Sequence, residues 1–176
     1  TEDKITNQDD ERLKQNRLIF YSQDVKDLKN VLIVFLKRTK AKCAILIDKE
    51  GHLITMHGDT DSYDMDTICA LLATTFAATQ EWAKLLGEKE FSVLFHQGKK
   101  DSIQVTLIED RALLAVIFDH RTQLGLVRLV CNEASKKIAK LFQGAGKRKS
   151  QEEEQMDFTL QNIGQIDDMF DDLFKE

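Results

Sequence analysis

Hydrophobic and polar residues follow two different periods along the chain, and the first part of this pattern predicts a helix and a hairpin. Over residues 24–40, apolar side chains recur every three or four positions and the segment ends in basic residues, which is typical of an amphipathic helix. Two short apolar runs, at 43–48 and 52–57, then flank Glu50 and Gly51. Because strand formers on both sides of such a turn pair with each other, this region predicts a β-hairpin.

A second helix, predicted over residues 65–86, is the most informative element. Asp64 or Asp66 can cap its start and Gly87 can end it. Its bulky apolar residues cover an arc of roughly 200°, which is wider than one core contact needs. We therefore expect an interface on this helix, the alternative being that its alanines simply face solvent. The wide arc holds Ile68, Leu71, Leu72, Phe76, Trp82, Leu85 and Leu86, and the remaining face of small or short side chains holds Ala70, Ala73, Thr74, Ala77 and Glu81.

Three further strands are predicted over residues 91–96, 102–108 and 112–118. The second of them alternates apolar and polar residues, whereas the third is apolar throughout, as expected for a central strand covered on both faces. A last core helix follows. The order α-β-β-α-β-β-β-α with short connections predicts an α+β fold in which helices flank a five-stranded antiparallel sheet.

The C-terminal part of the chain is predicted to carry one more amphipathic helix. Thr122 can cap the last core helix, and Gly144 and Gly146 can end it. Apolar residues then resume a helical period in a segment too short to be stable alone in water, which favours docking on a partner over a solvated end. The predicted docking residues are Ile163, Ile166, Phe170, Leu173 and Phe174. The chain thus divides into a flexible leader (1–17), a folded domain (18–143), a charged linker (144–158) and an acidic amphipathic docking segment (159–176).

Charge is distributed unevenly along the 176 residues. The net charge is −5, but residues 151–176 hold nine acids and one base, so the preceding 150 residues carry +3. No basic stripe with interleaved aromatic residues occurs, and no apolar run approaches the roughly 18 residues of a membrane span, so we expect neither nucleic-acid binding nor membrane insertion. Cys43, Cys69 and Cys131 each lie in an apolar segment, which predicts buried, unpaired thiols and a cytoplasmic protein.

Catalytic, cofactor and metal motifs are absent from the sequence. It has no phosphate-binding loop, no zinc-type cysteine spacing and no His-Glu-x-x-His, so we expect no catalytic residue, no cofactor and no metal site. His96 is interpreted as a strand-end side chain. Residues 119–122 combine an acid, a histidine, a base and a hydroxyl, but the turn before a helix explains them as well as chemistry does.

Five segments together resemble the roadblock (dynein light chain-like) family: residues 44–54, 77–88, 91–98, 116–129 and 166–174. The resemblance implies a roadblock-type domain that forms homodimers with the second helices side by side. It further implies activation of GTP hydrolysis by a bacterial Ras-like small GTPase of the MglA type, bound in its GTP state, which controls cell polarity and motility.

The same resemblance implies how such a protein acts and where. The GTPase's own switch residues are repositioned without an arginine finger, and the regulator has no active site of its own. The implied GTPase contacts lie on the second helix, and the C-terminal helix docks on the GTPase. The implied location is the cytoplasm, with a cell pole as one site within it. The candidate GTPase-binding residues are Thr74, Ala77, Ala78 and Glu81.

Two other function classes remain open at this level. Roadblock proteins also act as scaffolds that tether a GTPase without changing its turnover, and binding without stimulation would select that interpretation. Small-molecule sensors of the PAS or GAF type also pack helices on an antiparallel sheet. That class is disfavoured because the predicted strands offer no obvious polar residues for a ligand cavity.

Overall fold

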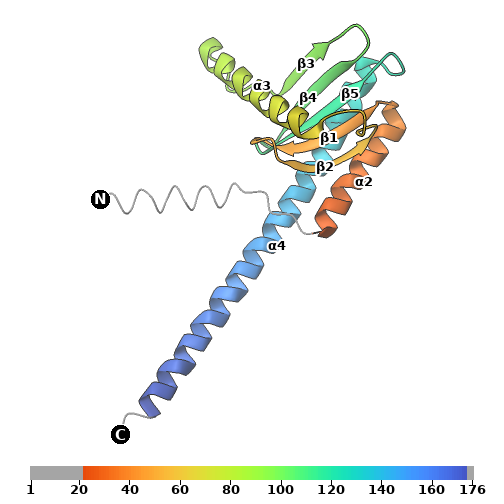
Figure 1. The fold of residues 1–176 in the computed structure, drawn as a ribbon. Coiled ribbons are helices and arrows are strands. Elements are labelled where there is room, and N and C mark those ends of the chain that lie inside the picture. Colours follow the sequence, from red (N-terminus) through yellow and green to blue (C-terminus); the bar gives the residue numbers. More distant parts are fainter. Residues whose placement is uncertain (1–21, 174–176) are drawn as a thin grey trace.

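The computed structural model describes residues 22–173 of the chain, with Glu153 and residues 157–173 described by their helical backbone alone. The predicted leader and Phe174 lie outside the described residues. Three layers are stacked: α3 on one face of a sheet, the sheet itself, and α2 with the first part of α4 on the other face (Figure 1). The elements are α2 (Ser22–Thr39), β1 (Cys43–Asp48), β2 (Leu53–Gly58), α3 (Met65–Leu86), β3 (Val93–Gln97), β4 (Ser102–Ile108), β5 (Ala112–Phe118) and α4 (Leu124–Leu173).

The five strands form one antiparallel sheet in the order β2-β1-β5-β4-β3. This confirms the predicted α+β class, the element order and the hairpin, in which Gly51 adopts a positive φ of 95°. The apolar run 112–118 is the central strand and is buried along its whole length, as predicted. Its successive residues point to opposite faces of the sheet and so contribute to two separate cores.

One core lies between the sheet and the α2/α4 layer, and the other lies under α3. Leu114 and Val116 of β5 face the first core, with Phe35 of α2 and Phe142 of α4. Leu113 faces the second core. Because α3 covers only one face of the sheet, its outer surface is free within the described residues, and this surface carries the candidate site.

Helix α4 corrects two predictions about its ends. It continues through Gly144 and Gly146 to Leu173, although each glycine costs a helix about 1 kcal/mol relative to alanine. Tertiary contacts hold this part in place, since the intervening Ala145 is buried and an ion pair joins Arg148 to Asp24 of α2. The predicted linker 144–158 is therefore helical. None of the described helices is both long and apolar enough to cross a membrane.

The start of α4 also differs from the prediction. The helix begins at Leu124, and the first backbone bond runs from the Val127 N–H to the Gln123 carbonyl. The buried Thr122 hydroxyl has no hydrogen-bond partner, so Thr122 does not cap the helix. Thr122 thus indicated where the helix begins, but it is not the residue that caps it.

The three cysteines are buried and unpaired, as predicted. Burial raises the pKa of the Cys43 and Cys131 thiols to about 11, and it also raises the pKa of Cys69. All three thiols are therefore protonated near neutral pH and act as small apolar side chains in the two cores.

Candidate functional site

Helix α3 has well-defined ends, which fix the residues on its outer surface. The Asp64 carboxylate accepts hydrogen bonds from the Thr67 backbone N–H (3.2 Å) and hydroxyl (2.7 Å), and these bonds lower its pKa. At the other end Gly87 adopts a φ of 74° and its N–H donates to the Lys84 carbonyl. Asp64, and not Asp66, is therefore the N-cap.

The core face of α3 is made largely of small side chains. Phe76 is buried as expected, but Ala73, which we predicted on the open small face, is only 6% exposed. That assignment is wrong because the β1–β2 turn approaches the helix closely. A Cβ atom on Gly51 would lie 3.3 Å from the Ala73 Cβ, so a bulkier residue at 73 would displace the turn. The other buried residues of this face are Cys69, Thr79 and Ala83.

The bulky apolar arc is wider than the core contact, as predicted, and four of its seven residues lie on the surface. Leu71, Trp82, Leu85 and Leu86 are exposed by 60%, 61%, 85% and 71%. We call these four residues the apolar stripe; Trp82, Leu85 and Leu86 lie together in the last turns of α3, and Leu71 lies about 16 Å nearer its start. Single exposed apolar residues are common, but neighbouring large ones such as Trp82, Leu85 and Leu86 indicate an interaction surface.

The four candidate GTPase-binding residues lie beside this stripe. Thr74, Ala77, Ala78 and Glu81 are all exposed on α3 and share an arc of roughly 100° at 100° per residue. The Thr74 hydroxyl donates to the Ala70 carbonyl (2.8 Å), and Glu81 pairs with Lys84 (2.6 Å), so both polar side chains lie along the helix. The two alanines leave the backbone open to close approach. The structure thus brings the four residues onto one surface, and their binding of a GTPase stays a prediction.

Strand β3 adds a second surface that the described chain leaves uncovered, namely one backbone edge of the sheet. Among the described strands it is an edge strand that pairs with β4 alone, and its Val93 is 44% exposed. An edge strand presents unpaired backbone N–H and C=O groups that can pair with another chain. Residues 87–92 connect it directly to the end of the apolar stripe. A self-complementary surface of this kind favours association of two copies.

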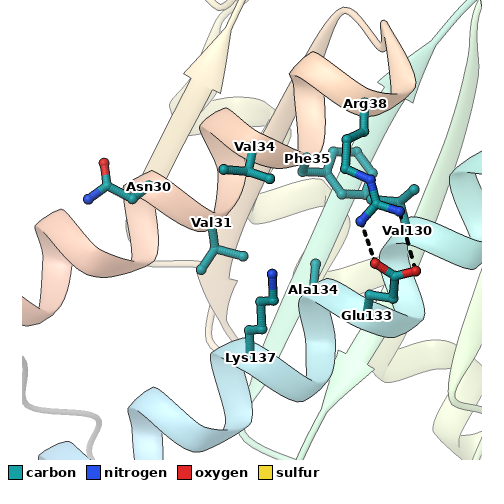
Figure 2. A pocket seen from close by; sticks show the side chains of 9 residues that line it. All are labelled: Asn30, Val31, Val34, Phe35, Arg38, Val130, Glu133, Ala134 and Lys137. Carbon is teal, nitrogen blue, oxygen red and sulfur yellow. Dashed lines mark hydrogen bonds and ion pairs between the residues drawn. The ribbon is translucent and has the colours of Figure 1, made fainter.

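On the opposite layer a groove runs between α2 and α4 (Figure 2). It has a volume of about 190 Å³, and a salt bridge between Arg38 and Glu133 joins the two helices beside it. This bond raises the pKa of Arg38 and lowers that of Glu133. The α2/α4 groove is lined by Asn30, Val31, Val34, Phe35, Arg38, Val130, Glu133, Ala134 and Lys137.

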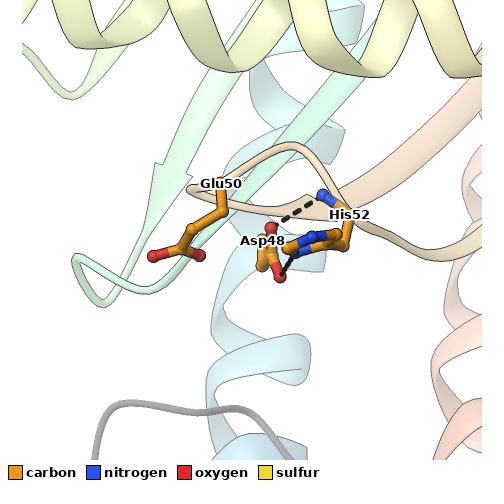
Figure 3. Close-up of side chains that lie close together, drawn as sticks. All are labelled: Asp48, Glu50 and His52. Carbon is orange, nitrogen blue, oxygen red and sulfur yellow. Dashed lines mark hydrogen bonds and ion pairs between the residues drawn. The ribbon is translucent and has the colours of Figure 1, made fainter. Parts of the chain in front are cut away.

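Two groups of polar residues have structural explanations. Figure 3 shows Asp48, Glu50 and His52 close together at the β1–β2 turn, with ligand-type atoms within 4.8 Å of one another. Asp48 accepts from the His52 backbone N–H (2.8 Å) and lies 2.8 Å from its Nδ1, so its carboxylate closes the turn. In the 119–122 segment, hydrogen bonds from the Arg121 side chain and backbone lower the pKa of Asp119 to about 2. This bonding fits the interpretation as a turn before a helix.

The predicted docking residues of the C-terminal segment fall on the distal part of α4. The backbone at Ile163, Ile166, Phe170 and Leu173 is helical, in agreement with the predicted period. Their side chains and the whole of Phe174 lie outside the described residues. Their docking role therefore stays a prediction.

A five-stranded antiparallel sheet between one helix and a pair of helices, in the order found here, defines the roadblock class of α+β domains. The Roadblock/LC7 domain profile matches residues 28–118. The chain belongs to this family, and it is an MglB-like member of it.

The similarity to MglB rests on three solved structures. Myxococcus xanthus MglB is 40% identical with a TM-score of 0.69, over 73% of this chain and 96% of that one. The gliding protein MglB of Thermus thermophilus is 33% identical with a TM-score of 0.68, over 72% and 96%. An MglB with a tetrameric arrangement gives 33% identity and a TM-score of 0.68, over 73% and 96%. Comparison with curated protein sequences finds no match.

Proposed function

We propose that this protein is a homodimeric GTPase-activating protein for a small Ras-like GTPase of the MglA type. It binds the GTPase in its GTP state and thereby controls cell polarity and motility. It acts in the cytoplasm, with a cell pole as one site of action. The observation that carries the proposal is the outer surface of α3, where an apolar stripe and a face of small residues lie side by side without covering in the described chain.

The two parts of this surface suit two different contacts. The apolar stripe and the free β3 edge are suited to a second copy, because both features are self-complementary and end at the same corner of the domain. The small face is suited to the GTPase, because Ala77 and Ala78 allow another backbone to approach closely. The oligomeric arrangement of an MglB relative supports the first assignment.

The mechanism follows from the side chains that this surface offers. Helix α3 contains no arginine, and its lysine, Lys84, is held by Glu81 at 2.6 Å. The surface therefore supplies no cation to the transferred phosphoryl group. Instead it stabilises the hydrolysing arrangement of the GTPase's own switch residues, a minor state that binding makes dominant.

Phosphate release from the cognate GTPase loaded with GTP tests the proposal. Saturating amounts of this protein should raise the single-turnover rate. Ala77→Arg should raise the concentration needed for half-maximal stimulation roughly 5- to 150-fold, since overpacking costs about 1–3 kcal/mol. Asn132→Arg adds the same side chain to an exposed position on α4 and should leave the stimulation unchanged. Binding without any rate increase would instead identify a scaffold, and an equal effect of both variants would remove α3 from the interface.

The C-terminal segment contributes a second contact to the GTPase in this proposal. Deleting residues 159–176 should weaken the complex without unfolding the domain, because the two described cores are built from residues between Leu28 and Phe142. Affinity of the shortened chain for the GTP-loaded GTPase, measured with its thermal unfolding midpoint, separates the two effects. A lowered midpoint would mean that the segment packs on its own domain.

A further inference from the structure

The layer formed by α2 and the first part of α4 is strongly basic. Helix α2 and residues 124–151 of α4 together hold eleven lysines and arginines against three acids. Two of the acids are already neutralised by cations of the same layer, since Asp24 pairs with Arg148 and Glu133 pairs with Arg38. The solvent face of this layer therefore carries excess positive charge, although the whole chain carries −5.

The α2/α4 groove gives this basic layer an apolar centre. Val34 lies in it with 46% exposure, and Leu126 and Leu129, exposed by 40% and 55%, lie on α4 one to two turns before Glu133. Lys137 and Lys140 are exposed on the same side of α4, within an arc of roughly 80° that also contains both leucines. Figure 2 shows Lys137 beside the valines of α2. A helix that suits this surface has an apolar face flanked by acids.

The C-terminal segment has that chemistry. Its residues 159–174 contain four acids and no base. On a helix, the five predicted docking residues from Ile163 to Phe174 lie within an arc of roughly 100° around the helix axis. Asp167 and Asp171 lie on the arc next to them. The lengths agree as well, since Asn30 to Arg38 span about 12 Å of α2 and the apolar face from Ile163 to Leu173 spans about 15 Å.

A chain cannot place this segment in its own groove while α4 is continuous. Lys137 and Ile163 are 26 positions apart on one helix, which corresponds to about 39 Å. In Figure 1 the blue end of α4 extends away from the sheet. The occupant must therefore come from another molecule.

We propose that the α2/α4 groove binds the C-terminal segment, residues 159–174, of a second copy of this chain. The charge excess of one surface and the deficit of the other provide attraction, and the matched apolar faces provide burial. A nucleic acid or an anionic membrane would use the positive charge, but the proposed occupant uses the apolar groove as well. The contact is distinct from the stripe on α3 and lies on the other side of the sheet, so it joins dimers into larger assemblies. It uses the same face of the segment as the proposed GTPase contact, so each segment makes one of these two contacts at a time.

A mixing experiment with the full chain tests this proposal. One variant spoils the groove (Val34→Glu with Lys137→Glu), and another spoils the segment (Phe170→Ser with Asp171→Lys). Sedimentation velocity should show assembly beyond the dimer for the wild type, weakened at least about tenfold in each variant and by added salt. An equimolar mixture of the two variants should regain assembly, because the intact groove of one accepts the intact segment of the other.

The controls make each outcome decisive. Lys29→Glu has the same charge change as Lys137→Glu but lies roughly 140° around α2 from Val34, and it should leave assembly unchanged. Failure of the mixture to regain assembly, or equal weakening by Lys29→Glu, would overturn the proposal. Unchanged assembly in both variants would overturn the proposal as well. If the groove variant then lost binding to phosphatidylglycerol vesicles or single-stranded DNA, the basic layer would bind a membrane or a nucleic acid instead. No GTPase is present, so a failure here leaves the proposed function untouched.

Discussion

Replacing Trp82 by alanine should weaken the homodimer strongly while changing the fold of each subunit little. The indole lies in the middle of the apolar stripe and is 61% exposed in the single chain. With a full side-chain area of about 250 Å² for tryptophan, roughly 150 Å² remains to be buried by a partner. At about 25 cal/mol per Å², complete burial would contribute up to about 4 kcal/mol per subunit.

The expected loss is smaller than this upper limit. Neighbouring leucines close part of the gap, and some of the area stays wet at an interface rim, so we expect the dimer to lose at least about 2 kcal/mol, or about 30-fold in its dissociation constant. Sedimentation equilibrium in about 0.5 M salt measures this constant while charge contacts between copies are screened. Far-ultraviolet circular dichroism should stay unchanged, since surface truncation rarely disturbs a fold.

Met156→Ala is the matched control for Trp82→Ala. Met156 is 62% exposed, nearly the same fraction, but lies on α4 away from α3. Its truncation should leave the dimer constant unchanged. If the dissociation constant of the Trp82→Ala dimer stayed within about threefold of the wild-type value, the apolar stripe would not be the dimer interface. Equal weakening by Met156→Ala would show that exposed area alone does not locate the contact.

Two further predictions concern the fold that presents this surface. Gly58→Ala should lower the free energy of urea unfolding by about 3 kcal/mol or more, because at a φ of 109° a Cβ atom there would lie 2.4 Å from the Lys42 carbonyl oxygen. Gly87 has a φ of 74° and open surroundings, so Gly87→Ala should lower it by only about 1 kcal/mol. Equal losses in the two variants would contradict this reasoning. Because Asp119 has a pKa lowered to about 2 against roughly 3.9 in an unfolded chain, its contribution to stability is present above about pH 4 and is lost as the pH falls towards 2. Asp119→Asn should flatten the acid limb of the stability profile, and an unchanged limb would exclude this carboxylate as its source.

Much of the fold could be predicted from periodicity. The central strand, the hairpin and the limits of α3 were correct, because buried strands, turns with glycine and capped helices leave local signals. The α2/α4 groove left no such signal. It arises where two helices separated by more than 80 residues pack side by side, so no local pattern announces it.

By itself the sequence determined which residues share a face of α3, because the helical period assigns each residue an angle. Only the tertiary structure decided which face meets the sheet. The close approach of Gly51 requires small residues such as Ala73 there, and this turned Trp82 and the leucines of the stripe outward. The same holds for α4, where glycines signal an end, but burial of Ala145 and the ion pair of Arg148 with Asp24 offset their modest local cost. Local propensities contribute tenths to about 1 kcal/mol per residue, so packing against a neighbouring element outweighs them.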